Sequence, residues 1–519
     1  MLASKRLLVN TSVTYCRSIF AVALGLLSSR WILEGLGQVD FGLMAVVGAL
    51  IGFVEFLNNI LANAAARFLA FSIGKNSEGE TQRWFNVSLF LHIAAPLVLI
   101  SVGWPIGEWA LDHFITIPDN RLATAHWVFR LSLILAFISM SFAPFRAMFI
   151  AKQDIAEMAI WGIAGSIANF ILAYVVWHYS GDSWLFFSIC SVAISSSLVL
   201  MQIGRAYKKY EECRIQFDLW LDWVRFRKLL SFSGWNLFGG LGQLLRGQGI
   251  AILLNRYFNP ISNPGVNASY TISNTVSSST QQLSSSLIGA FSPEINANEG
   301  RGDRERMLIQ ANRASKFGAY LTLLFAIPLI LEIEYVLNLW LVTPPVYASG
   351  MTSLILCTFI IDRLTVGQML SVSARGKIAG YQIMLGGFLL LTLPVAWLFL
   401  YLGLGPISVC WAYLITMSLC SIGRVFWAKH LVQFSPSIWL KEVFLPLMFL
   451  LTASVFTGRM SQLFLDASLG RLSLVVAATL LTNILLGWNL LLNTKERKTL
   501  LAALQSSLKR IYKLIRPQK

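Results

Sequence analysis

Two apolar stretches of this chain each carry an arginine on a polar helical face. The polar residues recur at steps of three, four or seven positions, which places them on one side of a helix. The faces consist of Asn10, Thr14 and Arg17 in the first stretch and of Asn236, Gln243 and Arg246 in the seventh. Guanidinium groups bind phosphate oxygens in a fork geometry, so these faces predict a shared anion site. The alternative is that each arginine bonds helix carbonyls or extends to the membrane surface.

The second apolar stretch carries a polar seam. Glu55, Asn59, Asn63 and Arg67 follow one another at intervals of four and share a helical face. Ionisable and amide side chains inside a membrane mark substrate or ion pathways. We therefore expect Asn59 and Asn63 to contact a polar substrate and Glu55 to be a candidate for ion coupling. The alternative is that Glu55 is a structural carboxylate held by neighbouring amides.

The tenth apolar stretch carries two adjacent charged residues, Asp362 and Arg363. Adjacent residues of a helix point about 100° apart, so the two need not pair with each other. Asp362 is the second candidate for ion coupling, with a structural role as the alternative. Arg363 is a candidate for substrate binding.

Residues 267–286 are unusually polar for their surroundings. The segment reads NASYTISNTVSSSTQQLSSS, in which fifteen of twenty residues are Ser, Thr, Asn or Gln and none is charged. Ile272, Val276, Leu283 and Leu287 form its one narrow apolar stripe. A membrane helix of this kind should not face lipid and is expected to line a wet space. Its candidate substrate-binding residues are Asn274, Ser278, Gln281 and Gln282.

The elements that position these residues are membrane spans. Hydrophobic residues make up 56% of the 519 and charged residues only 13%. Apolar runs long enough to cross about 30 Å of hydrocarbon recur along the whole chain. With the polar segment included we predict fourteen spans, at about 11–33, 41–69, 84–105, 123–148, 155–177, 183–204, 229–254, 267–290, 314–338, 349–372, 379–401, 406–428, 441–458 and 471–493.

The distribution of Lys and Arg supports this count. An even number of spans puts both termini on one side, and most basic residues fall on that side if it is cytoplasmic. The exceptions that fall in outside loops are Arg30, Arg121, Arg256, Arg459 and Arg471. The net charge of +16 has its excess in the segments 205–228 and 495–519. Anionic membrane lipid attracts such segments, so we expect a membrane partner and no nucleic acid.

The predicted fold is an all-α polytopic membrane protein with two related six-helix lobes. Weak matches between the halves keep a nearly constant offset, for example Arg30 with Arg256 and Pro96 with Pro328. Repeats with an even number of spans have parallel topology, related by a pseudo-two-fold axis along the membrane normal. The predicted parts are an N-lobe (1–204), a cytoplasmic amphipathic linker expected to be an interfacial helix (205–228), a C-lobe (229–430), two C-terminal helices (431–494) and a basic cytoplasmic tail (495–519).

Over roughly residues 7–430 the chain resembles the polysaccharide, or O-antigen, flippases of the MOP superfamily. The resemblance rests on the six-plus-six layout, the opening VNTSVTYCRSIFAVALGLLSSRWILEGLGQVDFG and the prolines of the third and ninth spans. That superfamily also holds the multidrug and toxic-compound extrusion transporters and the lipid II flippases, which the two extra C-terminal helices resemble. The resemblance implies alternating access of two lobes, which moves undecaprenyl-diphosphate-linked oligosaccharide across the bacterial inner membrane.

These features favour a transporter over an enzyme. No loop is large enough for a catalytic domain, which weighs against a glycopolymer ligase or polymerase. We expect no catalytic residue, metal or cofactor, with H⁺ or Na⁺ as candidate coupling ions. The expected partners of a monomeric chain are the lipid-linked oligosaccharide, membrane lipid, and polysaccharide polymerase or assembly proteins. The alternative is an ion-coupled multidrug antiporter of the same fold, although such an antiporter would favour more acidic spans.

Overall fold

The computed structural model describes residues 2–74, 78–152, 154–375, 379–492 and 497. Side chains are outside the description for residues 2–19 and for a few positions in later helices, Asn236 among them. The described residues are almost entirely helical and form no β-strand. In a membrane a helix satisfies every backbone hydrogen bond within itself, which explains why apolar runs of this length adopt it.

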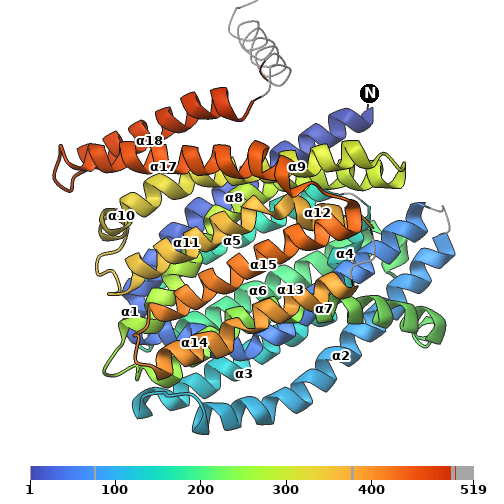
Figure 1. The fold of residues 1–519 in the computed structure, drawn as a ribbon. Coiled ribbons are helices and arrows are strands. Elements are labelled where there is room, and N and C mark those ends of the chain that lie inside the picture. Colours follow the sequence, from blue (N-terminus) through green and yellow to red (C-terminus); the bar gives the residue numbers. More distant parts are fainter. Residues whose placement is uncertain (1, 75–77, 153, 376–378, 493–496, 498–519) are drawn as a thin grey trace, which may run out of the picture. The chain divides into compact units, whose positions relative to one another are not determined.

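The helices follow the chain in a simple order (Figure 1). Those of the first half are α1 (Leu2–Gly74), α2 (Glu78–His113), α3 (Asp119–Ser141), α4 (Ala143–Ala151), α5 (Ile155–Trp177), α6 (Ser183–Lys209) and α7 (Trp223–Tyr257). Those of the second half are α8 (Gly265–Gly300), α9 (Arg304–Leu331), α10 (Ile333–Trp340), α11 (Ala348–Leu364), α12 (Val366–Arg375), α13 (Ala379–Leu390), α14 (Thr392–Tyr401), α15 (Ser408–Val432), α16 (Pro436–Trp439), α17 (Leu445–Gln462) and α18 (Leu469–Leu490).

Each of the fourteen predicted spans corresponds to a helix, to half of a bent helix, or to a pair of helices joined by a short break. The first two spans are the halves of α1, which meet at Gly37, where φ is +75° and ψ is 168°. An L-residue with a side chain rarely adopts that conformation, so glycine permits the bend. The fourth, ninth, tenth and eleventh spans are broken at Phe142, Glu332, Thr365 and Leu391. At Thr365 the bend between α11 and α12 is 47°.

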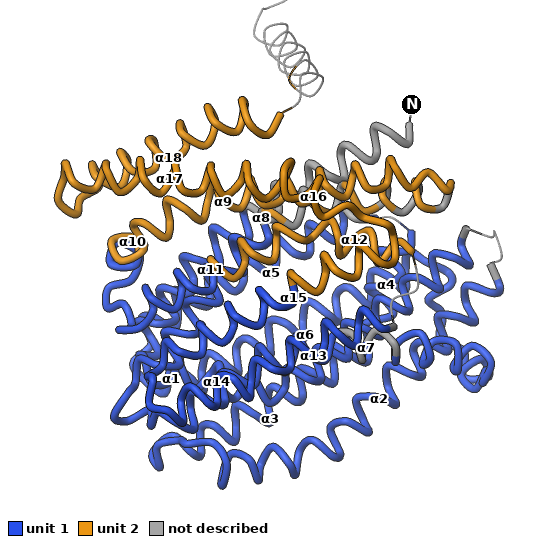
Figure 2. The backbone as a smooth tube through the Cα atoms, viewed as in Figure 1, with its two compact units in different colours: residues 1–283, 337–355, 379–420 blue, residues 284–336, 356–378, 421–519 orange. Residues whose placement is uncertain are grey.

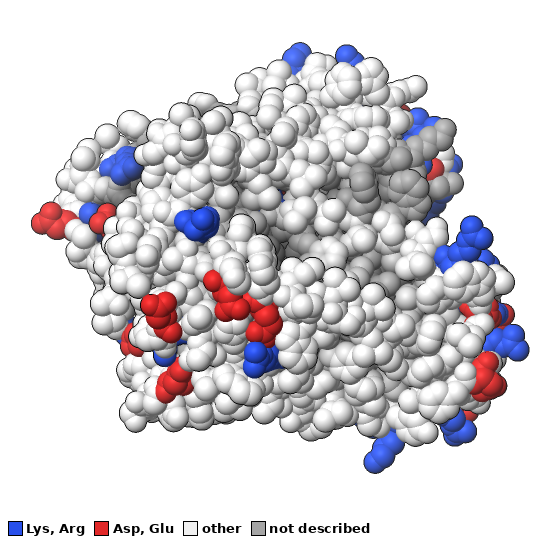
Figure 3. All heavy atoms as spheres, turned by 90° about the horizontal axis from the view of Figure 1, so that it is seen from below, with Lys and Arg blue, Asp and Glu red and all other residues white. Residues whose placement is uncertain are grey.

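Ten helices within the described residues are long and apolar enough to cross a membrane, or eleven if the bent pair α11–α12 counts as one span. The first of these ten stretches, residues 20–73, contains both halves of α1. The polar segment 267–286 lies within α8, a continuous helix of 36 residues. Because α8 is rich in polar residues, it is not one of the ten apolar helices. In the view of Figure 3 uncharged residues provide most of the surface, and charged side chains stand in small separate groups.

The linker 205–228 differs from its prediction. Instead of an interfacial helix, it contains the end of α6, two short 3₁₀ turns (Glu211–Cys213 and Phe217–Leu219) and the first turns of α7. Asn86 of α2 explains the change, because its side chain donates to the Arg214 carbonyl at 3.0 Å and accepts from the Gln216 amide at 2.7 Å. These tertiary bonds replace the bonds that a helix would make. Several apolar side chains of the linker nevertheless stay exposed, among them Phe217 and Leu221.

The chain divides into two compact units (Figure 2). Unit 1 consists of residues 1–283, 337–355 and 379–420. Its apolar core joins α7, α8, α11, α14 and α15 through buried residues such as Ile250, Tyr270 and Met351. Arg121, at the start of α3, ties α1 to the residue that caps α6, because its side chain binds Asp40 at 2.8 Å and Asp182 at 3.4 Å.

Unit 2 consists of residues 284–336, 356–378 and 421–519. Its apolar core joins α9, α11 and α17 through buried residues such as Leu323, Ile360 and Leu447. The two C-terminal helices, α17 and α18, pack side by side and against α9 (Figure 1). The predicted lobes, 1–204 and 229–430, are not the same division as these units and stay a prediction.

Candidate functional site

The second half of α1 runs antiparallel to α7 within unit 1. Two glycines make the approach close. A side chain at Gly52 would meet Gln248 at 2.7 Å, and one at Gly240 would meet Phe56 at 2.4 Å. Further along, the guanidinium of Arg67 lies 4.3 Å from the centre of the Phe232 ring. Glycine at such contacts lets helix backbones pack tightly, which fixes how each helix is rotated about its own axis.

The polar seam of α1 lies beside this contact and is open. Asn59 and Asn63 are each seven residues, or about two turns, beyond Gly52 and Phe56, so they share the face that meets α7. The side chains of Glu55, Asn59 and Asn63 are nonetheless exposed. A seam of amide and carboxylate groups with accessible atoms suits a wet space rather than lipid. Arg67 differs from its neighbours because its guanidinium stacks on Phe232 of α7.

Arg246 of α7 is half-buried against α15. Its guanidinium carbon lies 4.2 Å from the centre of the Tyr413 ring. Its Nη1 lies 3.8 Å from the sulfur of Met417. Gln243, three residues earlier, is exposed. Among the described side chains no carboxylate pairs with this cation, and an aromatic face and a thioether do not neutralise its charge, so it can bind an anion.

The polar helix α8 has a buried and an open side. Ser269 and Ser273 are buried and bind α11, since the Ser273 hydroxyl donates to the Ala348 carbonyl at 3.2 Å and Ser269 accepts from the Tyr347 amide at 3.2 Å. On the other side Asn274 is half-buried, and Ser278, Gln281 and Gln282 are exposed. These four residues share one helical face. The helix therefore presents the predicted substrate-binding residues away from its packed side.

Many hydroxyls of α8 are already bonded within the helix. The Thr271 hydroxyl donates to the Asn267 carbonyl at 2.8 Å, and that of Ser278 to the Thr275 carbonyl at 3.0 Å. Such bonds to the preceding turn satisfy the donor while leaving the oxygen lone pairs to accept. The helix can therefore offer acceptors from its hydroxyls and both donors and acceptors from its amides.

Four predicted site residues lie outside the described side chains. They are Asn10, Thr14 and Arg17 of α1 and Asn236 of α7. Their roles stay predictions. The part of the site that the structure describes in unit 1 consists of Glu55, Asn59, Asn63, Gln243, Arg246, Asn274, Ser278, Gln281 and Gln282.

The charged pair of the tenth span belongs to unit 2 and has a partner that the sequence analysis missed. Nη1 of Arg424, on α15, lies 2.8 Å from Oδ1 of Asp362 and also donates to the Asp362 carbonyl at 3.3 Å. Arg363 is more distant from Asp362, at 3.8 Å, and lies over the ring of Phe359. Both arginines are about 5–6% exposed. The only signal for Arg424 in the sequence is its position one turn inside the predicted span 406–428.

Comparison with known proteins identifies the fold. No family model matches the chain, and neither does any curated protein. Among solved structures, lipid II flippase MurJ in its inward closed conformation is similar over 91% of this chain and 97% of its own, with a TM-score of 0.67 and 13% identity. An inward-facing multidrug resistance MATE family transporter of the MOP superfamily matches over 82% of this chain and 98% of its own, with a TM-score of 0.63 and 14% identity. The chain shares its fold with these two transporters.

A third similar structure, a MOP superfamily transporter from Pyrococcus furiosus, matches over 83% of this chain and 97% of its own, with a TM-score of 0.59 and 16% identity. The chain is thus a multi-pass membrane protein whose structural neighbours are transporters. Within this fold, the polar faces of α1, α7 and α8 supply amides, hydroxyls, one carboxylate and the arginine of α7. These groups can bind a polar, anionic molecule.

Proposed function

We propose that this protein is a flippase that moves an undecaprenyl-diphosphate-linked oligosaccharide from the cytoplasmic to the periplasmic leaflet by alternating access. The oligosaccharide would be a repeat unit of O-antigen, capsule or exopolysaccharide. Support comes from the MOP fold, shared with a lipid II flippase, and from the chemistry of the open polar faces. In this proposal the lobes 1–204 and 229–430 move against each other, both termini are cytoplasmic, and the membrane is the bacterial inner membrane.

The single observation that carries the proposal is the setting of Arg246. The guanidinium rests on Tyr413 and Met417, which are uncharged. Close by on the same helix face is Gln243, whose side chain is exposed. A diphosphate carries the negative charge that Arg246 requires, and a guanidinium bonds two phosphate oxygens at once. We propose Arg17 as the second cation of this site.

The open side of α8 suits the sugar. Sugars present many hydroxyl groups, which need both donors and acceptors to replace water. Asn274, Gln281 and Gln282 provide amides, and the neighbouring hydroxyls provide acceptors. No charged side chain occurs between Gly265 and Leu283. We propose that this side of α8 contacts the oligosaccharide, and that Asn59, Asn63 and Asn236 complete its polar surroundings.

One observation favours a second function, that of an ion-coupled multidrug antiporter. Glu55 is an exposed carboxylate within a membrane span, and it would attract a cationic drug or a coupling ion. A multidrug resistance MATE family transporter has a similar fold, which supports this alternative. The flippase remains our first proposal because Arg246 would repel a cationic drug.

Complementation distinguishes the two functions. A strain that lacks its own oligosaccharide flippase should regain surface polysaccharide when it expresses the wild type, and lose it again with Arg246→Ala. Arg256→Gln is a matched control, because Arg256 is an exposed arginine at the last turn of the same helix. If the strain gains resistance to cationic drugs and no polysaccharide, the antiporter is correct and the flippase is not.

A further inference from the structure

The linker 205–228 exposes several large apolar side chains. Four of them fall within eight consecutive residues and are 64–81% exposed: Phe217, Leu221, Trp223 and Val224. We call these four residues the linker cluster. Single exposed apolar residues are common on proteins, whereas a contiguous group marks a surface that contacts lipid or another protein. None of the four belongs to the candidate site described above.

The linker is held against α2, so the exposure of the cluster is a defined feature of the fold. The Asn86 side chain bonds its backbone at two points. Arg225, in the first turn of α7, pairs with Glu80 of α2. The ring centre of Trp220 lies 5.7 Å from that of Phe90 on α2. Some side chains of the linker therefore bind α2, and those of the linker cluster remain on the outside.

The linker lies at the depth of a membrane boundary. Residues 79–113 of α2 are long and apolar enough to cross a membrane. The stretch of α2 without Asp, Glu, Lys or Arg runs from Trp84 to Gly107, and about 20 such residues cross the hydrocarbon. Asn86 and Phe90, which hold the linker, belong to the first turns of that stretch. The linker therefore packs beside α2 where this helix enters the membrane.

The charge of the linker is partly neutralised within the protein. Arg205 and Lys209 bind Glu157 of α5 at 2.7 and 2.6 Å, and Arg225 binds Glu80. The attraction to anionic lipid that the sequence predicts is therefore weaker than the number of basic residues implies. Apolar contact with lipid does not depend on charge, and the linker cluster can provide it.

We propose that the linker cluster inserts into one leaflet of the membrane, at the boundary between headgroups and acyl chains, and anchors the connection between α6 and α7. Trp, Phe and Leu are the side chains that interfacial segments bury at this level. Lipid is the partner, rather than a soluble protein, because the cluster adjoins the membrane-spanning part of α2 and follows α6, whose residues 183–209 form another candidate span. The proposal does not depend on what the protein transports.

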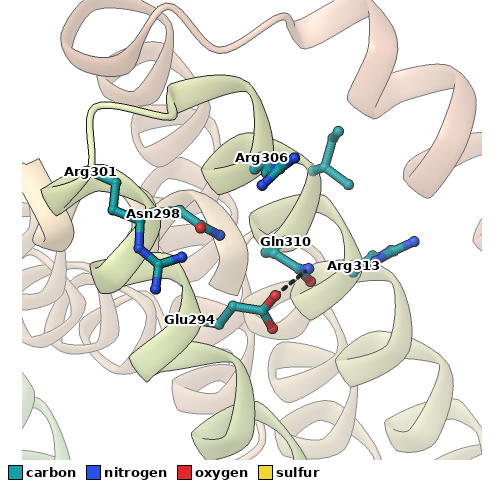
Figure 4. Close-up of a pocket in the computed structure, with 7 residues that line it drawn as sticks. Glu294, Asn298, Arg301, Arg306, Gln310 and Arg313 are labelled. Carbon is teal, nitrogen blue, oxygen red and sulfur yellow. Dashed lines mark hydrogen bonds between the residues drawn. The ribbon is translucent and has the colours of Figure 1, made fainter.

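An exposed isoleucine of unit 2 provides a matched control. Ile309 of α9 is 46% exposed and lines a hollow of about 660 Å³ at the α8–α9 turn. Figure 4 shows charged and amide side chains around this hollow, with a hydrogen bond of 2.8 Å from Gln310 to Glu294. A hollow with such a lining suits water rather than lipid. Ile309 therefore tests whether exposure of an apolar residue is enough to give lipid contact.

The test places the photoreactive amino acid p-benzoylphenylalanine at position 221, and separately at position 309, of the full-length protein in nanodiscs of phosphatidylcholine. On irradiation the benzophenone joins to a neighbouring C–H group, and mass spectrometry identifies the adduct. We expect a lipid adduct at position 221 in several-fold higher yield than at position 309. The yield at position 221 should be the same in about 0.1 M and about 1 M salt, because salt screens charges and not apolar contact.

A second measurement compares unfolding temperatures in the same nanodiscs. Leu221→Asp should lower the unfolding temperature, because it brings a charge to the apolar boundary, whereas Ile309→Asp should not. Irradiation in native membranes distinguishes the partners, and we expect lipid adducts there as well. Equal lipid yields at positions 221 and 309, loss of the adduct at high salt, or an adduct with another protein in place of lipid would each overturn the proposal.

Discussion

The guanidinium carbon of Arg246 lies 4.2 Å from the centre of the Tyr413 ring, which joins α7 to α15 through a cation–π contact. Tyr413 packs against the same apolar cluster as Tyr270 of α8. The Tyr270 hydroxyl in turn donates to the Gly247 carbonyl of α7 at 3.2 Å. The position of Arg246 is therefore set by three helices, and Tyr413 is the residue that orients its charged end.

The first prediction concerns this orientation. Tyr413→Leu removes the aromatic face, and a partly desolvated cation–π contact contributes about 0.5–2 kcal/mol. We expect flipping of a fluorescent lipid-linked oligosaccharide in proteoliposomes to slow a few-fold. The loss should be much smaller when Arg246→Ala is already present, because the ring then has no cation to orient. Additive losses in this double-mutant cycle would mean that Tyr413 acts independently of Arg246.

The second prediction concerns the anchor of the C-terminal helices. The Glu332 side chain is fully buried, and its carboxylate binds Arg471 of α18 at 2.8 Å and Gln462 of α17 at 2.9 Å. Arg471→Ala leaves a buried carboxylate without its cation, which typically costs about 3–5 kcal/mol. We expect a clearly lower unfolding temperature in detergent. Lys441→Ala, an exposed change in the turn that precedes α17, should have almost no effect, and an equal loss from both variants would contradict the assignment.

The third prediction separates the two acidic candidates for ion coupling. Glu55 is exposed, whereas Asp362 binds the buried Arg424 at 2.8 Å. Glu55→Gln should abolish the response of transport to an H⁺ or Na⁺ gradient while the protein stays folded. Asp362→Asn should mainly destabilise the protein, because it leaves Arg424 without its carboxylate. The opposite pattern, a stable Asp362→Asn that ignores the gradient beside a responsive Glu55→Gln, would assign the coupling to Asp362.

The fourth prediction concerns the packing of α12 on α9. A methyl group at Gly367 would lie 1.8 Å from the backbone oxygen of Ala311, and backbone cannot move aside as a side chain can. We expect Gly367→Ala to destabilise unit 2 by more than about 1–3 kcal/mol, the usual cost of overpacking. Gly387→Ala is the matched control, since no atom lies within 4 Å of its added methyl group. That variant should unfold at or slightly above the wild-type temperature, because alanine favours the helix.

The fifth prediction concerns pH. Hydrogen bonds from Arg304, and then from Arg375, hold the pKa of the Glu299 carboxyl below its usual value. The ionised Glu299 therefore stabilises the folded state at pH values above the pKa of a glutamate in the unfolded chain, about 4.3. This stabilisation is lost as the pH falls through the lower pKa that Glu299 has in the folded state. Glu299→Gln should therefore lower the unfolding temperature at pH 7 and make little difference near pH 3. The same difference at both values would show that charge is not the cause.

Much of the fold follows from the sequence, because a membrane helix makes its backbone hydrogen bonds locally. Apolar length predicts the spans, and the distribution of basic residues requires the polar segment 267–286 to be one of them. The structure confirms that segment as part of one continuous helix, α8. The i, i+4 spacing of Glu55, Asn59 and Asn63 likewise determines that they share a face, and the structure shows that face to be open.

The tertiary structure decided which distant residues meet. Arg246 and Tyr413 are 167 positions apart, and no local sequence pattern links them. Many other contacts of the site also join residues that are distant in the sequence. Their meeting depends on how α7 is rotated and how closely it approaches its neighbours, which Gly240 and Gly242 determine through contacts with Phe56 and Gly386. The pairing of Asp362 with Arg424 arises in the same way. Helical periodicity fixes a residue's face, whereas packing between helices fixes what that face touches.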